Sequence, residues 1–164
     1  MEAVRAMNKE AKDAYFKQRN QKRIGEEKAK EWMKHNEIQH IRYGIDALDS
    51  GVPLWKVPNF VRSAPDFIAF KLNAQFLEAK AFKYTIKIKV KDVEEYKEWN
   101  KLMKLYVLFY DIIEDCFLCI GLDKLVYTIE NNPTKIASYP ESKKNTYYII
   151  EKQWLPEFKK IGEK

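Results

Sequence analysis

The chain has 164 residues, enough for one domain with its own core, and its 46% hydrophobic content with only 5 Gly and 6 Pro excludes a disordered or fibrous protein. Thirty Lys and Arg against 24 Asp and Glu give a formal net charge of +6. This balance makes a polyanion such as nucleic acid the first candidate partner, although a Lys-rich surface that only solvates the protein explains the charge equally well.

No targeting or membrane pattern is visible. The N-terminus, MEAVRAMNKEAKDAYFKQRNQKR, lacks the apolar stretch of a signal peptide, and no segment reaches about 18 consecutive apolar residues. We therefore expect a soluble, cytoplasmic protein without a membrane partner. A reducing compartment suits Cys116 and Cys119, whose C-x-x-C spacing lies in a strand-like run without two further zinc ligands. Both are expected to be core residues, and a redox pair is the alternative.

A helical pattern runs from about residue 4 to residue 35, because this stretch is rich in Ala, Glu, Lys and Gln and contains no Pro. Gly25 is a candidate break in it. A break there would separate a basic helical extension, residues 1–23, from a single domain at residues 24–164. The extension is either a DNA-contacting arm or a solvated helix.

The rest of the chain alternates strand and helix patterns. After a strand at EIQHIRYGID and a long connection, the apolar runs DFIAFK and QFLEAKAF are separated by LNA, where Asn73 favours a hairpin. KDVEEYKEWNKLMKL has the apolar spacing of a helix, and YVLFYDII and CFLCIGL are typical of strands covered on both faces. With a final strand at TYYIIEK, this order predicts an α/β fold, a mixed central β-sheet flanked by helices.

Three charged residues lie in the most strand-like part of the chain. The triplet E-x-K occurs six times, but only Glu78/Lys80 lies in an apolar strand, where alternation puts both side chains on one face. Asp66 comes level with them if the hairpin pairs around Asn73. Buried charges are costly unless they are paired or bind a cation, so we expect either a metal site or a surface salt bridge of Lys80 on a water-exposed face. Two hard oxygen ligands would suit Mg²⁺ or Mn²⁺ better than zinc.

Pro65-Asp66, eleven intervening residues and then Glu78-Ala79-Lys80 resembles the motif of the PD-(D/E)xK nuclease superfamily, which includes restriction enzymes, Holliday junction resolvases and many phage nucleases. The order of elements between about residues 24 and 112 is also similar to that superfamily. The resemblance implies a restriction endonuclease-like core and a Mg²⁺-dependent endonuclease that hydrolyses DNA phosphodiester bonds, with Mn²⁺ as a substitute. The alternative is a non-catalytic nucleic-acid-binding module on a degenerate nuclease core.

The resemblance also implies a role for each residue of the motif. Asp66 and Glu78 would be metal ligands, with the carbonyl of Ala79 as a third. Lys80 would orient or help to deprotonate the attacking water and stabilise charge on the scissile phosphate. The number of metal ions stays open. Because such nucleases mostly act as dimers when both strands are cut, a homodimer is implied, with the basic N-terminal helix as the candidate contact.

Further residues surround the motif in the sequence. Glu26 resembles the accessory acid of the first helix, and Glu27 competes with it because a break at Gly25 would change the phase of the helix. Basic residues before and after the motif could follow a phosphate backbone, and a Lys-rich edge strand that resists aggregation is the alternative. These candidate nucleic-acid-binding residues are Lys56, Arg62, Lys83, Lys87 and Lys89.

Overall fold

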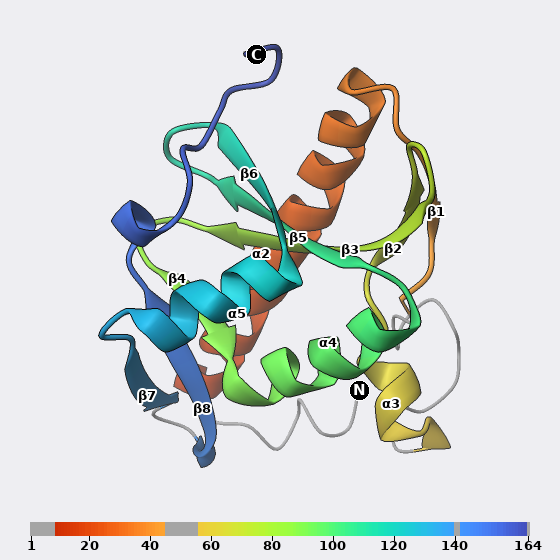
Figure 1. Cartoon of the computed structure of the whole chain (residues 1–164). Helices are drawn as coiled ribbons and strands as arrows, with labels where there is room; N and C mark the ends of the chain where they lie inside the picture. The colour runs from red at the N-terminus through yellow and green to blue at the C-terminus, as the bar shows by residue number, and fades with distance from the viewer. Residues whose placement is uncertain (1–8, 45–55, 140–141, 164) are drawn as a thin grey trace.

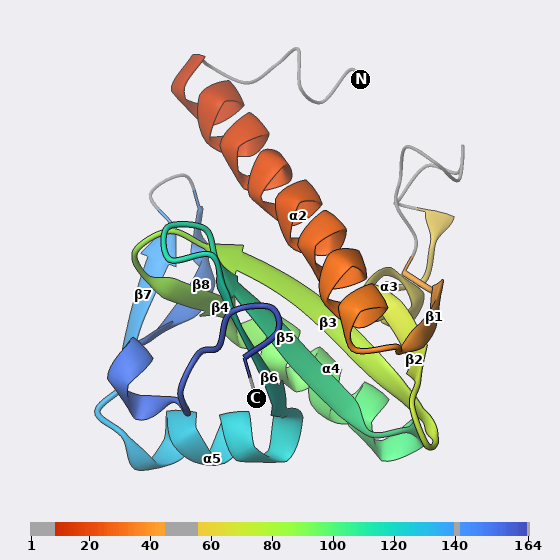
Figure 2. The same cartoon turned by 90° about the horizontal axis from the view of Figure 1, so that it is seen from above.

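The computed structural model describes residues 9–44, 56–139 and 142–163. Its central sheet has the spatial order β1-β2-β3-β5-β6, in which β3 and β5 are parallel and the other neighbours antiparallel. The strands are β1 (Gln39–Arg42), β2 (Phe67–Phe70), β3 (Ala74–Phe82), β5 (Leu105–Asp111) and β6 (Cys116–Gly121). Helices cover both faces (Figures 1 and 2). The predicted mixed sheet flanked by helices is therefore confirmed.

The long helix α2 (Lys9–His35) covers one face of this sheet, as Figure 2 shows, and buries Ala29 and Met33 there. It runs through Gly25 without interruption, so the predicted break is wrong, and the boundary that we placed between residues 23 and 24 falls inside the helix. A Cβ at position 25 would lie 3.2 Å from the backbone nitrogen of Ala81. The glycine therefore lets the helix approach β3 closely instead of ending it.

The opposite face is covered by α4 (Val90–Leu102), α5 (Leu122–Asn131) and a separate three-stranded antiparallel sheet. That sheet has the order β4 (Ile86–Lys89), β8 (Ser142–Ile150) and β7 (Lys135–Tyr139). The sequence interpretation missed α5, although Leu122, Leu125 and Ile129 recur at helical spacing and are buried. Smaller helices are α3 (Asn59–Arg62) and η2 (Lys152–Trp154). No helix in the described parts of the chain is long and apolar enough to span a bilayer.

The hairpin of β2 and β3 has the predicted register. Phe67 pairs with Leu77 and Phe70 with Ala74, which leaves residues 71–73 as the turn. Asp66 directly precedes Phe67, and Glu78 directly follows Leu77. Asp66 is therefore level with Glu78. It lies where β2 begins, and beyond this point β3 is no longer paired with β2.

Candidate active site

The backbone of Asp66 is fixed by the chain that follows β1. The Asp66 carbonyl accepts hydrogen bonds from the N–H groups of Tyr43 (2.9 Å) and Gly44 (3.3 Å). A Cβ at Gly44 would lie 3.2 Å from the Pro65 carbonyl oxygen, so only a glycine passes here without displacing that chain. The segment that follows β1, although far from Asp66 in the sequence, thus holds the backbone of this aspartate in place.

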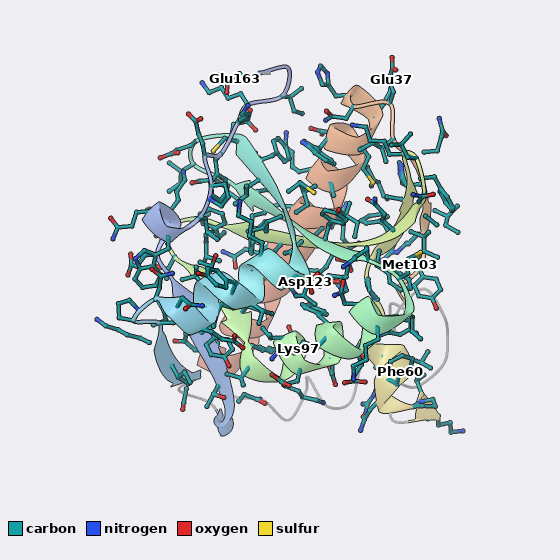
Figure 3. All side chains as sticks on the ribbon, viewed as in Figure 1. Glu37, Phe60, Lys97, Met103, Asp123 and Glu163 are labelled. Atoms are coloured by element: carbon teal, nitrogen blue, oxygen red, sulfur yellow. The ribbon has the colours of Figure 1, made fainter. Side chains whose placement is uncertain are left out.

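Aromatic packing holds the segment that leads into Asp66. The Trp99 ring of α4 stacks on Phe60 of α3 with centroids 4.1 Å apart, and it meets Tyr43 edge-on at 5.8 Å. Figure 3 shows Phe60 on α3. The indole N–H of Trp99 also donates to Ser63 Oγ at 3.3 Å. These contacts attach two segments to α4. One is the segment that precedes Asp66, and the other contains Tyr43, whose N–H group binds the Asp66 carbonyl.

The carboxylates of Asp66 and Glu78 form one buried pair. The N–H of Ala79 donates to Asp66 Oδ2 at 2.9 Å, and the N–H of Asp66 donates to Glu78 Oε2 at 3.3 Å. Both acidic residues are only 6% exposed. The structure therefore brings the two predicted metal ligands together, in the register that the sequence predicted.

Glu78 has further partners on the α4 side of the sheet. Its Oε1 accepts a hydrogen bond from the Tyr96 hydroxyl (2.7 Å) and pairs with Lys80 Nζ (2.8 Å). Lys80 Nζ also lies 3.5 Å from Asp92 near the start of α4. Glu78 and Lys80 thus share one face, as expected, but that face is packed against α4 and not open to water. The surface salt bridge is wrong in this respect, because Glu78 is buried and Lys80 is half-buried.

The two carboxyl groups are both buried, but their neighbours shift their pKa values in opposite directions. Burial, followed by repulsion from Glu78, raises the pKa of Asp66 to about 7, against the opposing effect of Lys22 and Lys80. Burial also acts to raise the pKa of Glu78, but the Lys80 ammonium and the hydrogen bonds from Lys80 and Tyr96 outweigh it and hold that pKa below the usual value. Glu78 is thus well compensated by its neighbours, whereas Asp66 is not.

The Lys80 side chain is held as an ammonium. Burial acts to lower its pKa, but Glu78, Tyr96 and Asp92 raise it well above the usual value. A lysine that accepts a proton from water needs a lowered pKa. In this environment Lys80 can stabilise negative charge or orient a water molecule, and it is a poor proton acceptor.

The helix α2 contributes a third acid. Glu26 is 9% exposed and pairs with Arg42 of β1 (3.2 Å) and with Lys22 (3.6 Å), which in turn lies 3.6 Å from Asp66 Oδ1. Glu27 instead points outward and pairs with Arg23 at 3.1 Å. Of the two candidate accessory acids, Glu26 is therefore the one that faces Asp66, and Lys22 connects them.

The donor atoms at this place fit a hard divalent cation. Asp66 and Glu78 supply carboxylate oxygens, the ligands that Mg²⁺ and Mn²⁺ prefer. The N–H and C=O of one strand residue point to the same side of the strand, and the N–H of Ala79 points at Asp66. The Ala79 carbonyl therefore lies on the side where a third ligand is expected. The raised pKa of Asp66 reflects negative charge that a cation would balance.

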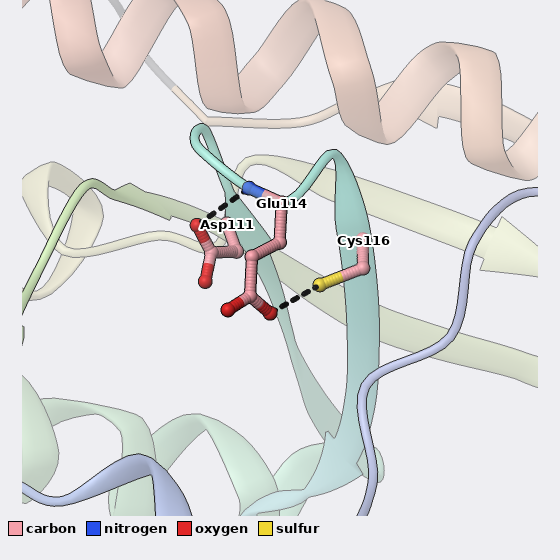
Figure 4. A group of neighbouring side chains, drawn as sticks. All are labelled: Asp111, Glu114 and Cys116. Carbon is pink, nitrogen blue, oxygen red and sulfur yellow. Dashed lines mark hydrogen bonds between the residues drawn. The ribbon is translucent and has the colours of Figure 1, made fainter.

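A second group of potential metal ligands was not predicted. Ligand atoms of Asp111, Glu114 and Cys116 lie within 4.8 Å of one another at the turn between β5 and β6 (Figure 4). Lys152 Nζ, however, lies 2.9 Å from Asp111 Oδ2 and 3.9 Å from Cys116 Sγ, and also bonds Glu114. The N–H groups of Ile113 (2.9 Å) and Glu114 (3.2 Å) donate to Asp111 Oδ1. An ammonium group thus already occupies the position of a cation there.

The two cysteines behave as packing residues. Cys116 is buried and Cys119 half-buried, and both are free thiols. Three residues apart on β6, they point to opposite faces of the sheet. Burial raises the pKa of both thiols, that of Cys119 to about 12, so neither is a reactive thiolate at neutral pH. These observations agree with core residues and disfavour a redox pair.

The five candidate nucleic-acid-binding residues are all exposed and fall into two groups. Lys56 and Arg62 lie at α3, whereas Lys83, Lys87 and Lys89 lie at β4. Figures 1 and 2 place α3 and β4 at opposite ends of α4. Because β4 is also an edge of the small sheet, its lysines suit the protection of that edge as well as contact with phosphates.

Comparison with known proteins adds little to this description. No family model and no curated protein matches the chain. Among solved structures it is similar to a nuclease from a fusselovirus, with 14% sequence identity and a TM-score of 0.45, over 80% of this chain and 77% of that chain. A likeness this distant carries no argument about function, so the functional proposal depends on the geometry of the site.

Proposed function

We propose that the chain is a Mg²⁺-dependent endonuclease that hydrolyses DNA phosphodiester bonds at Asp66, Glu78 and Lys80. The observation that carries the proposal is that two buried carboxylates each accept a hydrogen bond from a backbone N–H group of the other's segment, with a lysine on the same face of β3. Taking two carboxylates out of water is strongly unfavourable unless a cation compensates them. Lysines compensate Glu78, and Asp66 still needs positive charge.

In the proposed centre, Asp66, Glu78 and the Ala79 carbonyl would hold Mg²⁺, and Mn²⁺ would substitute for it. The bound cation would neutralise charge on the scissile phosphate and favour ionisation of a water molecule. Tyr96 fixes the orientation of the Glu78 carboxylate, and the Ala79 N–H fixes that of Asp66. Both ligands would thus be positioned before the cation arrives.

Lys80 would act as a cation and not as a base. Its raised pKa keeps the ammonium charged at neutral pH, so it can stabilise negative charge that develops on the phosphate and orient the attacking water. Glu26 of α2 would remain an accessory acid, and its charge is balanced by Lys22 and Arg42.

The charge of the molecule supports the proposed substrate class. The net charge of +6 and the exposed basic groups at α3 and β4 support a nucleic-acid substrate, with duplex or structured DNA as the proposed class. Cutting both strands would require a homodimer or two separate cutting events.

A panel of labelled DNA substrates tests the proposal. Junction, flap, duplex and single-stranded DNA would be incubated with Mg²⁺, Mn²⁺ or EDTA. We expect cleavage of at least one substrate with metal and none with EDTA, and loss of cleavage in Asp66→Ala and Lys80→Ala. Cleavage at the wild-type rate by both purified, folded variants would show that the site lies elsewhere.

The direct 2.8 Å pair of Lys80 and Glu78 favours a second candidate function. Because this pair satisfies Glu78 without a metal, the chain could be a non-catalytic module that only binds nucleic acid. That function predicts salt-dependent DNA binding, but no nicking of supercoiled plasmid at any Mn²⁺ concentration.

A further inference from the structure

A lysine outside the recognised motif reaches the candidate metal centre from α2. Lys22 Nζ lies 3.6 Å from Asp66 Oδ1 and 3.6 Å from Glu26 Oε1, one helical turn further on. Its ammonium therefore stands between the proposed metal ligand and the proposed accessory acid.

Lys22 faces the oxygen of Asp66 that the Ala79 N–H does not use. Oδ2 accepts the hydrogen bond of the Ala79 N–H, whereas Oδ1 faces Lys22. Both oxygens of Glu78 are likewise engaged, one with Tyr96 and Lys80 and the other with the Asp66 N–H. A cation that approaches Asp66 must therefore share Oδ1 with the Lys22 ammonium or displace it.

Displacement of Lys22 requires little structural change. Its side chain is 55% exposed, and both ion pairs are longer than direct hydrogen bonds. Lys80, in contrast, is 28% exposed and held at 2.8 Å by Glu78. The two lysines at this centre thus differ in how easily they can leave.

We propose that Lys22 is a tethered monovalent cation that competes with the divalent metal for Asp66 and swings out of the centre when the metal binds. This inference rests on the proposed metal site at Asp66 and Glu78. Its consequence is that Lys22 weakens metal binding. The Lys22 ammonium partly offsets the charge of Asp66 and Glu26 while the metal is away, and once displaced it becomes free to contact a phosphate of the substrate.

Calorimetric titration of the full chain with Mn²⁺ tests this competition without relying on activity. Lys22→Met keeps the aliphatic stem and removes the charge, so we expect it to bind Mn²⁺ about three- to tenfold more tightly than wild type. Arg23→Met is the matched control, because it removes one positive charge from the next residue, which is 78% exposed and pairs with Glu27. It should stay within about twofold of wild type, since its charge lies in solvent.

Asp66→Asn separates failure of the inference from failure of the proposed function. Mn²⁺ binding that is lost in Asp66→Asn and strengthened only in Lys22→Met supports the competition. If binding is lost in Asp66→Asn but is equal or weaker in Lys22→Met, or rises as much in Arg23→Met, the role of Lys22 is overturned and the metal site stands. Binding that survives in Asp66→Asn would overturn both.

Thermal unfolding provides a second measurement on the same proteins. Because tighter binding to the native state stabilises it more at a given concentration, a fixed Mn²⁺ concentration should raise the Tm of Lys22→Met more than that of wild type. Lys22→Arg retains a cation and should return the Mn²⁺-induced shift to the wild-type value. A large shift in Lys22→Arg would contradict competition by charge.

Discussion

Within the residues that the structure describes, carboxylates surround a lysine in two clusters. One joins Asp66 and Glu78 to Lys80, and the other joins Asp111 and Glu114 to Lys152. In the second cluster, backbone N–H groups and the Lys152 ammonium engage Asp111, and Glu114 is 62% exposed. The close approach of carboxylates alone therefore does not distinguish a metal site from a structural contact.

The first cluster differs because both of its acids are buried, whereas in the second Asp111 is buried and Glu114 is exposed. Burial and repulsion from Glu78 raise the pKa of Asp66 to about 7 although Lys22 and Lys80 lie nearby, so these lysines compensate its ionised form only in part. The residual demand for a cation, and not the number of acids, is the feature that points to a metal.

The largest contrast is expected in DNA cleavage. Asp66→Asn should lower the rate by at least about a hundredfold, because it removes a proposed ligand from the reacting centre. Lys152→Met should keep cleavage within a few-fold, since it alters only the second cluster. Initial rates on the best substrate of the panel measure both. Full loss of cleavage in folded Lys152→Met, together with activity in Asp66→Asn, would assign the active centre to the cluster at the β5–β6 turn.

Metal-dependent stabilisation should separate the clusters next. At a Mn²⁺ concentration a hundredfold above Kd, binding to the native state contributes about 2.7 kcal/mol to the free energy of unfolding. Urea denaturation with and without Mn²⁺ should show this gain in wild type and Glu114→Gln, and its loss in Glu78→Gln. The reverse pattern would assign the metal to Asp111, Glu114 and Cys116.

The pH dependence of stability should report Asp66 in the metal-free protein. Its folded pKa of about 7 lies above the ordinary value, so between about pH 4 and pH 7 the folded state binds more protons than the unfolded one. The free energy of unfolding should therefore fall as pH rises through this window, by about 2 kcal/mol from pH 5 to pH 8.

Asp66→Asn cannot titrate at this position, so its free energy of unfolding should change less over the same range. Urea denaturation of both proteins at pH 5 and pH 8 in EDTA measures the difference. Equal slopes in wild type and Asp66→Asn would mean that another group titrates in this window.

The sequence predicted those parts of the site that depend on local pattern. Alternation placed Glu78 and Lys80 on one face, and Asn73 set the hairpin turn that makes Asp66 level with Glu78. Glu26 was predicted with Glu27 as its alternative, and the uninterrupted α2 decides between them. All of these positions are fixed by the period of one element or by one tight turn.

The remaining parts depend on how elements cross, which no local pattern specifies. Lys22 lies in a basic stretch whose lysines all look solvated, and Tyr96 has the spacing of an ordinary core residue. Ile86 and Ile88 alternate as in any half-buried strand, so nothing indicated that β4 pairs with β8 outside the central sheet. Gly25 was misread because glycine marks both helix breaks and close approaches of backbone.

The smallest contrast concerns the stability that the second cluster supplies. Lys152→Met leaves the carboxylate of Asp111, a residue only 4% exposed, without its ammonium partner. The backbone N–H groups of Ile113 and Glu114 still engage that carboxylate, and Lys152 is partly exposed, so we expect a loss of only about 1 kcal/mol in the free energy of unfolding. Lys124→Met, an exposed lysine on α5, is the control and should change stability less. Equal stability of the two variants in urea would show that Lys152 is not needed to hold the C-terminal segment on the β5–β6 turn.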